Sequence, residues 1–368
     1  MNKGFILKAL FLLCFLFSQT AQGQSFTPGE IWPDNHQVHI NAHGGGILYE
    51  NGTYYWFGEH KTEGEAGNLA NVGVHCYSSD DLYHWKDCGI ALSVIENDPG
   101  HPISKGCILE RPKVIYNPLT KKYVMWFHLE PKGAGYSGAL SGIALSDRVT
   151  GPYTFLKAVR PNAGSWPINV LPIHKTTRRP SAEEERQCTG GSLNILGRDM
   201  EQGQMARDMN LFVDDDGKAY HIYSSEENST LHIAELDPTY TGYTGKYIRV
   251  FINRFMEAPA MFKKDGNYYL IMSGCSGWNP NAARSAIASS IWGEWKELGN
   301  PCIGQDADLT FHSQSTYILP VQGKKNQFIY MGDRWTPQNA IDGRYIWLPI
   351  HFEGPKPIIE WKDSWTLD

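Results

Sequence analysis

The chain has 368 residues, of which 12% are aromatic and 37 are glycine, and its formal net charge is −6. This length suffices for one large all-β domain or for two ordinary domains. Because lysine and arginine are nowhere clustered, the composition argues against a nucleic-acid partner.

Residues 1–23 have the pattern of a secretory signal peptide. Lys3 and Lys8 precede an apolar run from Ala9 to Phe17, and small residues follow at Ala21 and Gly23. This run is shorter than a membrane-spanning helix requires. We therefore expect cleavage after Gly23, a secreted or periplasmic protein, and no membrane insertion of the mature chain.

Six cysteines remain when Cys14 of the leader is removed. An exported protein can oxidise them, but their positions do not select one set of disulfides and do not match a zinc site. The sequence gives no indication of the oligomeric state.

One pattern recurs five times along the chain. It consists of a polar residue, a short apolar strand, a turn with Gly, Asn or Lys, and an aromatic-rich strand; its copies begin at His43, Glu110, Arg207, Glu257 and Gln314. The turn chemistry of each copy indicates a β-hairpin, and further strand signals follow each hairpin. Three or four strands per unit, repeated five times, predict an all-β protein with a single five-bladed β-propeller domain over residues 24–368.

The second repeat is longer than the others because of a segment from about Arg160 to Gln204. Its charged stretch, residues 178–187, is expected to be a solvated loop. A position of this segment at the rim of the pocket is the alternative.

The residue that opens each repeat is expected to point into a pocket. In a propeller the first strand of each blade lines the central axis, so its opening residue faces one end of the channel. These residues are His43, Glu110 with Arg111, Asp208, Glu257 and Gln314. Converging carboxyl groups are what glycoside hydrolysis requires, since one protonates the leaving oxygen while another group activates water or attacks carbon. We therefore predict a glycoside hydrolase that acts on a polysaccharide or oligosaccharide.

Glu257 is the predicted general acid. It lies between Met256 and the small residues Ala258 and Pro259. Apolar neighbours raise the pKa of a carboxyl group, which suits a proton donor.

The remaining pocket residues are assigned to sugar binding or to support of the acid. Arg111 adjoins Glu110 and is expected to be its positive neighbour or a substrate clamp. Asp208 suits hydrogen bonding to sugar hydroxyls. Trp278 and Trp335 offer flat faces for stacking on a sugar ring.

No metal site and no cofactor are expected. His36, His39 and His43 are close in sequence, but in an extended strand only His39 and His43 share a face, so a pocket or core role is favoured. A structural cation in the axial channel, near His312, is kept as an alternative.

The blade-opening motifs together resemble glycoside hydrolase family 43, and above all its exo-β-1,3-galactanase branch. The motifs are AHGGGILY, LERPKVIYN, ARDMNLFVDDDGKAY, EAPAMFKKDGNYYLIMSGCSGW and HSQSTYILP, and in this order they span nearly the whole mature chain. The resemblance implies a five-bladed propeller and release of galactose from the end of β-1,3-galactan, as in arabinogalactan, with inversion. It assigns the acid to Glu257 on blade four, and orientation and tuning of the acid to Glu110 on blade two.

Blade one departs from the family pattern. Where most members have an aspartate base, this chain has Ala42, His43 and Gly44. The galactanase branch shares this loss, and there a glutamine on blade five, matched here by Gln314, is thought to position the water. Glu59 is an ionised alternative. The resemblance also places four residues around the terminal sugar: Glu59, Arg111, Asp208 and Trp278.

Two other functions stay open on the sequence alone. Relatives with similar motifs include α-L-arabinofuranosidases, which share the fold. A non-catalytic glycan-binding propeller is the third reading, favoured by the missing base and disfavoured by the retained pair Glu257 and Glu110.

Overall fold

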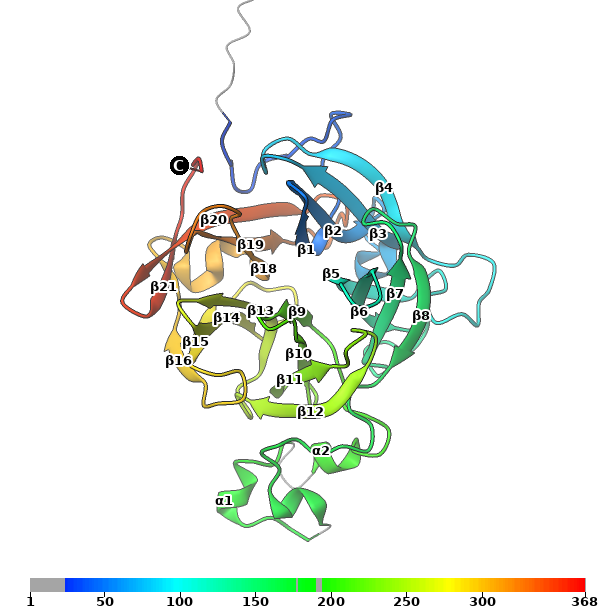
Figure 1. Cartoon of the computed structure of the whole chain (residues 1–368), viewed down its shortest axis with the longest axis vertical. Helices are drawn as coiled ribbons and strands as arrows, with labels where there is room; N and C mark the ends of the chain where they lie inside the picture. The colour runs from blue at the N-terminus through cyan, green and yellow to red at the C-terminus, as the bar shows by residue number, and fades with distance from the viewer. Residues whose placement is uncertain (1–23, 177, 190–193, 368) are drawn as a thin grey trace, which may run out of the picture.

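The computed structural model describes residues 24–176, 178–189 and 194–367, so the predicted signal peptide lies outside the described residues. The described chain is a five-bladed β-propeller, as predicted (Figure 1). Each blade is one sheet built from one stretch of sequence, and the innermost strands touch in a ring around the axis.

The strands of each blade follow one another from the axis outwards, except for the short β17 at the outer edge of blade five. Blade one comprises β1 (His43–Glu50), β2 (Thr53–Lys61), β3 (Asn71–Ser79) and β4 (Lys86–Ser93). Blade two comprises β5 (Ile108–Asn117), β6 (Lys122–Glu130), β7 (Leu140–Ser146) and β8 (Thr154–Val159). Blade three comprises β9 (Met209–Val213), β10 (Ala219–Ser225), β11 (Thr230–Leu236) and β12 (Tyr243–Val250). Blade four comprises β13 (Met256–Lys264), β14 (Asn267–Gly274), β15 (Arg284–Ala288) and β16 (Lys296–Gly299). Blade five comprises β18 (Gln314–Pro320), β19 (Phe328–Arg334), β20 (Arg344–Glu353), β21 (Lys356–Glu360) and β17 (Cys302–Ile303).

The hydrophobic core is divided into layers between neighbouring blades. Strand β6 shows the cause, because four successive residues, Val124, Met125, Trp126 and Phe127, are all fully buried. Side chains alternate between the two faces of a strand. Val124 and Trp126 therefore pack against blade three, while Met125 and Phe127 pack against blade one. A strand covered on both faces has a continuous apolar run instead of a polar alternation.

An aromatic layer joins blade five to blade one, where the ring closes. Trp56 of β2 and Trp347 of β20 pack in this layer with ring centroids 4.8 Å apart. Near the chain ends, Phe26 and Trp365 stack at 4.4 Å and exchange backbone hydrogen bonds of 2.8 and 3.1 Å. In the described residues no strand is exchanged between these two blades.

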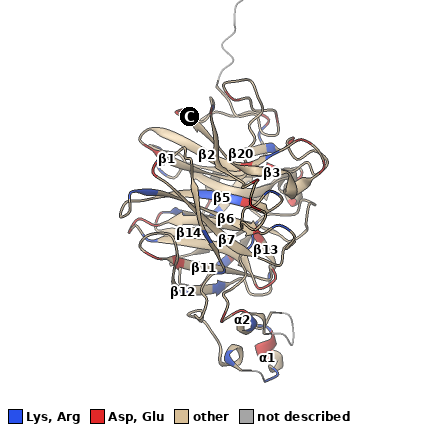
Figure 2. Ribbon diagram, turned by 90° about the vertical axis from the view of Figure 1, so that its right-hand side faces the viewer, with Lys and Arg blue, Asp and Glu red and all other residues tan. Residues whose placement is uncertain are grey.

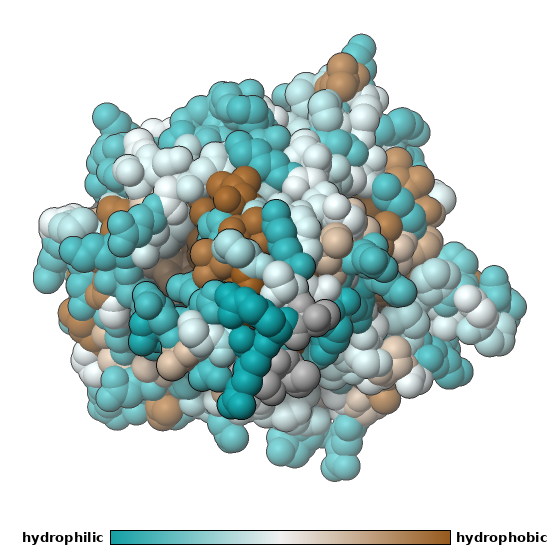
Figure 3. All heavy atoms as spheres, turned by 90° about the horizontal axis from the view of Figure 1, so that it is seen from below, coloured by the Kyte–Doolittle hydropathy of each residue, from teal (hydrophilic) through white to brown (hydrophobic). Residues whose placement is uncertain are grey.

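The long segment between β8 and β9 forms a lobe beside blade three (Figures 1 and 2). It contains the 3₁₀ helix η2 (Pro172–Lys175) and the one-turn helices α1 (Ala182–Glu185) and α2 (Ile195–Arg198). The predicted solvated loop at 178–187 is thus partly helical, because Ser181 caps the Glu184 N–H and Glu184 caps Ser181 in return. Viewed from below, the lobe's side of the molecule is mostly hydrophilic, with some hydrophobic atoms near its centre (Figure 3).

Two further 3₁₀ helices, η1 (Gly67–Ala70) and η3 (Ala307–His312), lie in loops that border the pocket. None of the helices in the described residues is long and apolar enough to cross a bilayer.

Candidate active site

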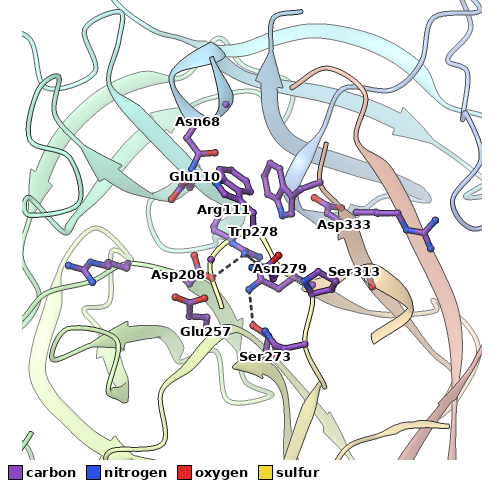
Figure 4. A pocket seen from close by; sticks show the side chains of 18 of the residues that line it. Asn68, Glu110, Arg111, Asp208, Glu257, Ser273, Trp278, Asn279, Ser313 and Asp333 are labelled. Atoms are coloured by element: carbon purple, nitrogen blue, oxygen red, sulfur yellow. Dashed lines mark hydrogen bonds and ion pairs between the residues drawn. The ribbon is translucent and has the colours of Figure 1, made fainter. Parts of the chain in front are cut away.

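A cavity of about 670 Å³ opens where the innermost strands begin (Figure 4). All five blades contribute to its lining. Of the nine predicted site residues, eight line this cavity: Glu59, Glu110, Arg111, Asp208, Glu257, Trp278, Gln314 and Trp335. The positions that the repeats pick out therefore converge in space.

A shared irregularity at the start of the innermost strands explains this convergence. The pairing register slips just after the opening residue in blades one, two, four and five. Such β-bulges re-aim side chains locally. In three blades the next residue has a left-handed backbone, with φ of 58° at Gly44, 57° at Arg111 and 52° at Ala258. Gly44 also has no room for a side chain, since a Cβ there would lie 2.3 Å from Glu59 Oε1.

These three left-handed residues attach blades one, two and four to the blade that precedes each in the ring. The Gly44 N–H donates to Asp333 Oδ2 of blade five, and the Arg111 N–H donates to Glu59 Oε1 of blade one at 2.9 Å. The Ala258 N–H donates to Asp208 Oδ2 of blade three at 3.0 Å. Three pocket carboxylates thus also hold neighbouring blades in register.

Glu257 lies in surroundings that favour its protonated form. Burial and, second, the negative charge of Asp208 raise the pKa of Glu257 to about 7, against the opposing charge of Arg111. The Asn228 side-chain amide donates to Glu257 Oε1 at 2.8 Å. A carboxyl group with this pKa can hold a proton at neutral pH and release it to a substrate.

Glu110 has the opposite surroundings. Its Oε2 lies 2.8 Å from His128 Nδ1, and its Oε1 accepts from the Tyr136 hydroxyl at 2.8 Å. Burial favours the neutral acid, but the hydrogen bond and charge of His128 outweigh it and lower the pKa of Glu110 to about 2. Despite burial, Glu110 and Glu130 raise the pKa of His128 to about 9, so His128 is a cation between two carboxylates. Glu110 is therefore ionised.

Gln314 is fixed by contacts at both ends of its amide. Its Oε1 accepts from Arg111 Nη2, and its Nε2 donates to Ser273 Oγ at 2.7 Å. Arg111 Nη2 also lies 3.1 Å from Asp208 Oδ2 (dashed in Figure 4). A side-chain amide has two acceptor positions and two N–H groups. One of each remains for a water molecule or a sugar hydroxyl.

Glu59 is held more tightly by the protein. Its Oε1 accepts from the Arg111 N–H, and its Oε2 lies 2.8 Å from Lys61 Nζ. Both side chains are almost wholly buried. Burial raises the pKa of Glu59, against the charge of Lys61. Because both oxygens are engaged, Glu59 is a weaker candidate for activating water than the sequence implies.

Trp278 and Trp335 form an aromatic wall of the cavity. Their rings meet edge to face, with centroids 5.7 Å apart and an interplanar angle of 70°. Trp278 remains 49% exposed, so its face is free to meet a ligand. Both rings line the cavity, and their stacking on a sugar stays a prediction.

His43 is the predicted site residue that does not line the cavity. It is 1% exposed, and its ring stacks on Trp335 with centroids 4.9 Å apart. Burial lowers the pKa of His43 to about 3, with Lys61 adding to the effect, so the ring is neutral. The expectation that His43 points into the pocket and helps to bind the substrate is corrected accordingly, since Trp335 from blade five covers this position and His43 supports it from behind.

Sequence reasoning missed Asp333, a carboxyl group in the cavity lining. Burial raises the pKa of Asp333 to about 7, against the Gly44 hydrogen bond. A signal was present, because Asp333 lies opposite Gln314 just as Glu59 lies opposite His43, and each follows a glycine. Other lining residues were also missed: Asn68, His128, Tyr136, Arg207, Asn228, Ser273, Asn279 and Ser313.

No group of three or more His, Cys, Asp or Glu in the described residues is arranged to hold a metal ion. His312 lines the cavity, and its Nε2 lies 3.4 Å from Asp306 Oδ2 with both side chains nearly half exposed.

The comparisons with known proteins agree with this geometry. The model of Glycosyl hydrolases family 43 matches residues 193–344. The family 43 β-1,3-galactosidase BT3683, solved with galactodeoxynojirimycin, is 51% identical over 93% of this chain and all of that chain, with a TM-score of 0.87. The chain belongs to glycoside hydrolase family 43. It is therefore a glycoside hydrolase, and the predicted family is confirmed.

Two solved exo-β-1,3-galactanases are also similar to this chain. An exo-β-1,3-galactanase from Clostridium thermocellum is 34% identical over 94% of this chain and 67% of that chain, with a TM-score of 0.76. One from Phanerochaete chrysosporium, solved with β-1,3-galactotriose, is 32% identical over 94% of this chain and 68% of that chain, with a TM-score of 0.76. A search of curated protein sequences found no match.

Proposed function

We propose that this family 43 hydrolase releases galactose from the non-reducing end of β-1,3-galactan, the backbone of arabinogalactan, with inversion at the anomeric carbon. One observation carries the proposal. A single cavity holds a carboxyl group with a pKa of about 7, Glu257, and an ionised one with a pKa of about 2, Glu110. Such a divergence separates the proton donor from the anionic partner. The similar galactosidases and galactanases support the choice of sugar.

In the proposed reaction, Glu257 gives its proton to the glycosidic oxygen as the C1–O bond breaks. The amide of Gln314 holds a water molecule on the opposite face of the sugar, and this water forms the new bond to C1. Since a neutral amide is a poor base, the water passes its surplus proton to solvent as the bond forms. Displacement by water in one step inverts the anomeric centre.

The other lining residues bind the terminal sugar in this proposal. Ionised Glu110 accepts hydrogen bonds from hydroxyl groups, as do the side-chain oxygens of Asp208, and Arg111 keeps Gln314 and Asp208 in place. Trp278 stacks on the ring. We further propose that residues 1–23 direct export and that the mature enzyme works outside the cytoplasm, where polysaccharides are found.

Proton NMR of the reaction mixture tests this proposal. With β-1,3-galactan, we expect galactose as the released sugar and α-galactose as the first anomer to appear. Arabinan is the matched control and should release no arabinose. An initial β-galactose signal would contradict inversion, and release of arabinose alone would favour an arabinofuranosidase.

A further inference from the structure

The turn that carries Asn228 has an unfavourable backbone. It connects β10 to β11, and three successive residues, Glu226, Glu227 and Asn228, have φ of 50°, 57° and 64°. Apart from glycine, asparagine and aspartate, residues rarely adopt this left-handed conformation, and Glu226 and Glu227 are both outside that set. A turn of this kind persists only where its surroundings impose it.

Glu226 anchors the turn in a buried charge cluster. Arg249 donates from Nε to Glu226 Oε1 at 2.6 Å and from Nη2 to Oε2 at 2.7 Å. His232 Nε2 lies 2.8 Å from Oε1, and the Thr189 hydroxyl donates to Oε2 at 2.6 Å. Glu226, His232 and Thr189 are each no more than 1% exposed.

The lobe between β8 and β9 completes this cluster. Thr189 belongs to the lobe, and Arg249 Nη2 also donates to the carbonyl oxygen of Gln187 at 3.0 Å. His174 Nε2, again from the lobe, lies 3.2 Å from Arg249 Nη1. Without the lobe, the Glu226–Arg249 pair would lose partners on one side.

The other two residues of the turn are also held. Arg198 of α2 and Arg207 contact the Glu227 carboxylate at 3.2 and 3.1 Å. Arg207 Nη1 donates to Asn228 Oδ1 at 3.3 Å. This last contact orients the Asn228 amide so that its Nδ2 points to Glu257.

Asn228 is where the turn meets the acid. Its Nδ2 donates to Glu257 Oε1 at 2.8 Å. The charged or titratable groups that also act on Glu257 are Asp208, Arg111 and the Cys275 thiol. Of these, Cys275 likewise contacts the turn, with its Sγ 3.9 Å from the Asn228 carbonyl oxygen.

We infer that the 160–204 lobe is a positioning element for the general acid. Through Thr189 and the Glu226–Arg249 pair it fixes the left-handed turn, and the turn holds Asn228 against Glu257. The inference rests on the proposed role of Glu257. Thr189 and Arg249 are positioning residues, because they act through Asn228 and do not reach the cavity.

The test replaces the Thr189 hydroxyl by a methyl group. Thr189→Val keeps the shape of the side chain and removes its hydrogen bond to Glu226. We expect kcat on β-1,3-galactan to fall about fivefold with KM nearly unchanged, and Thr189→Ser to restore it. On β-galactosyl fluoride, whose fluoride leaves without acid assistance, the loss should be less than about twofold. Arg178→Ala is the matched control, because Arg178 pairs with Glu184 inside the same lobe and should leave both rates unchanged.

A double-mutant cycle with Asn228→Ala shows whether the effect passes through the turn. Asn228→Ala should lower kcat on galactan about 10²-fold, and adding Thr189→Val should then cost nothing more. The Asn228 hydrogen bond lowers the pKa of Glu257. Both single variants should therefore raise this pKa and move the high-pH limb of kcat to higher pH. Additive effects, or equal losses on both substrates, would overturn the inference.

Glu257→Gln in the same experiment separates the two proposals. If Glu257→Gln retains normal turnover of galactan, the assignment of the acid fails. If Glu257→Gln is inactive on galactan but Thr189→Val shows no substrate dependence, the role of the lobe alone fails.

Discussion

Glu110 and Glu257 lie near the start of equivalent strands in blades two and four, yet the pKa of Glu110 is lowered to about 2 and that of Glu257 is raised to about 7. Part of the difference comes from the residue opposite each one on the second strand. His128 pairs with Glu110 and keeps it ionised, whereas Ser273 pairs with Glu257 and its hydroxyl oxygen accepts a hydrogen bond from Gln314. The blades supply the same position. A cross-strand cation lowers the pKa of Glu110, whereas Glu257 has no such partner and burial and the Asp208 charge raise its pKa.

Removal of the acid should give the largest effect. In Glu257→Gln the side chain keeps its shape and has no proton to give, so kcat on β-1,3-galactan should fall by about 10³-fold. Kinetics on galactan measure this loss, and galactose affinity by calorimetry checks that the pocket is intact. Near-normal turnover would show that Glu257 is not the proton donor, and its contrast with Glu110 would then have no role in catalysis.

Removal of the Gln314 side chain, on the other side of the sugar from the acid, should give the second-largest loss in kcat. Gln314→Ala removes the amide that would hold the water, and we expect a loss of about 10²-fold in kcat. Glu59→Gln is the comparison, with a smaller loss in kcat and a lower melting temperature, because it leaves Lys61 buried without its partner. A larger kcat loss in Glu59→Gln at unchanged melting temperature would make Glu59 the base.

The smallest change should be in the pH dependence. The Asp208 charge raises the pKa of Glu257, so Asp208→Asn should let the acid ionise more easily. The high-pH limb of kcat should then move to lower pH, with a loss at the optimum of about tenfold or less, since an amide oxygen can still accept from the Ala258 N–H. Glu110→Gln should move this limb less, and the reverse order would give the tuning role to Glu110.

The fold and most of the pocket could be predicted from the sequence because both depend on repetition. Five hairpins with the same turn chemistry fix the number of blades, and the opening residue of each falls at one end of the axis. Glu110, Asp208, Glu257 and Gln314 are found in this way without any knowledge of side-chain contacts.

The features of the site that could not be predicted from the sequence depend on contacts between blades, which the repeat pattern does not encode. His43 opens its strand like the others, but Trp335, distant in sequence, lies over it. Asn228 looks like an ordinary turn residue, because the left-handed backbone and the anchoring of Glu226 come from the lobe and from β12. Asp333 could have been predicted from the repeats, since its place opposite Gln314 repeats that of Glu59 opposite His43.

The closure of the ring has a mechanical consequence for the enzyme. Blades one to five are joined in sequence, but no stretch of chain runs from blade five on to blade one, and these two blades meet through packing, the Phe26–Trp365 bridge and hydrogen bonds such as Asp333–Gly44 and Gln322–Tyr54. Gln314 and Trp335 lie on one side of this seam and Glu59 lies on the other. Parting the seam moves Gln314 and Trp335 away from Glu59, while neighbouring blades elsewhere in the ring stay connected by the chain. We therefore expect heat or denaturant to open the ring first at this seam, so that the reaction stops while the individual sheets are still folded.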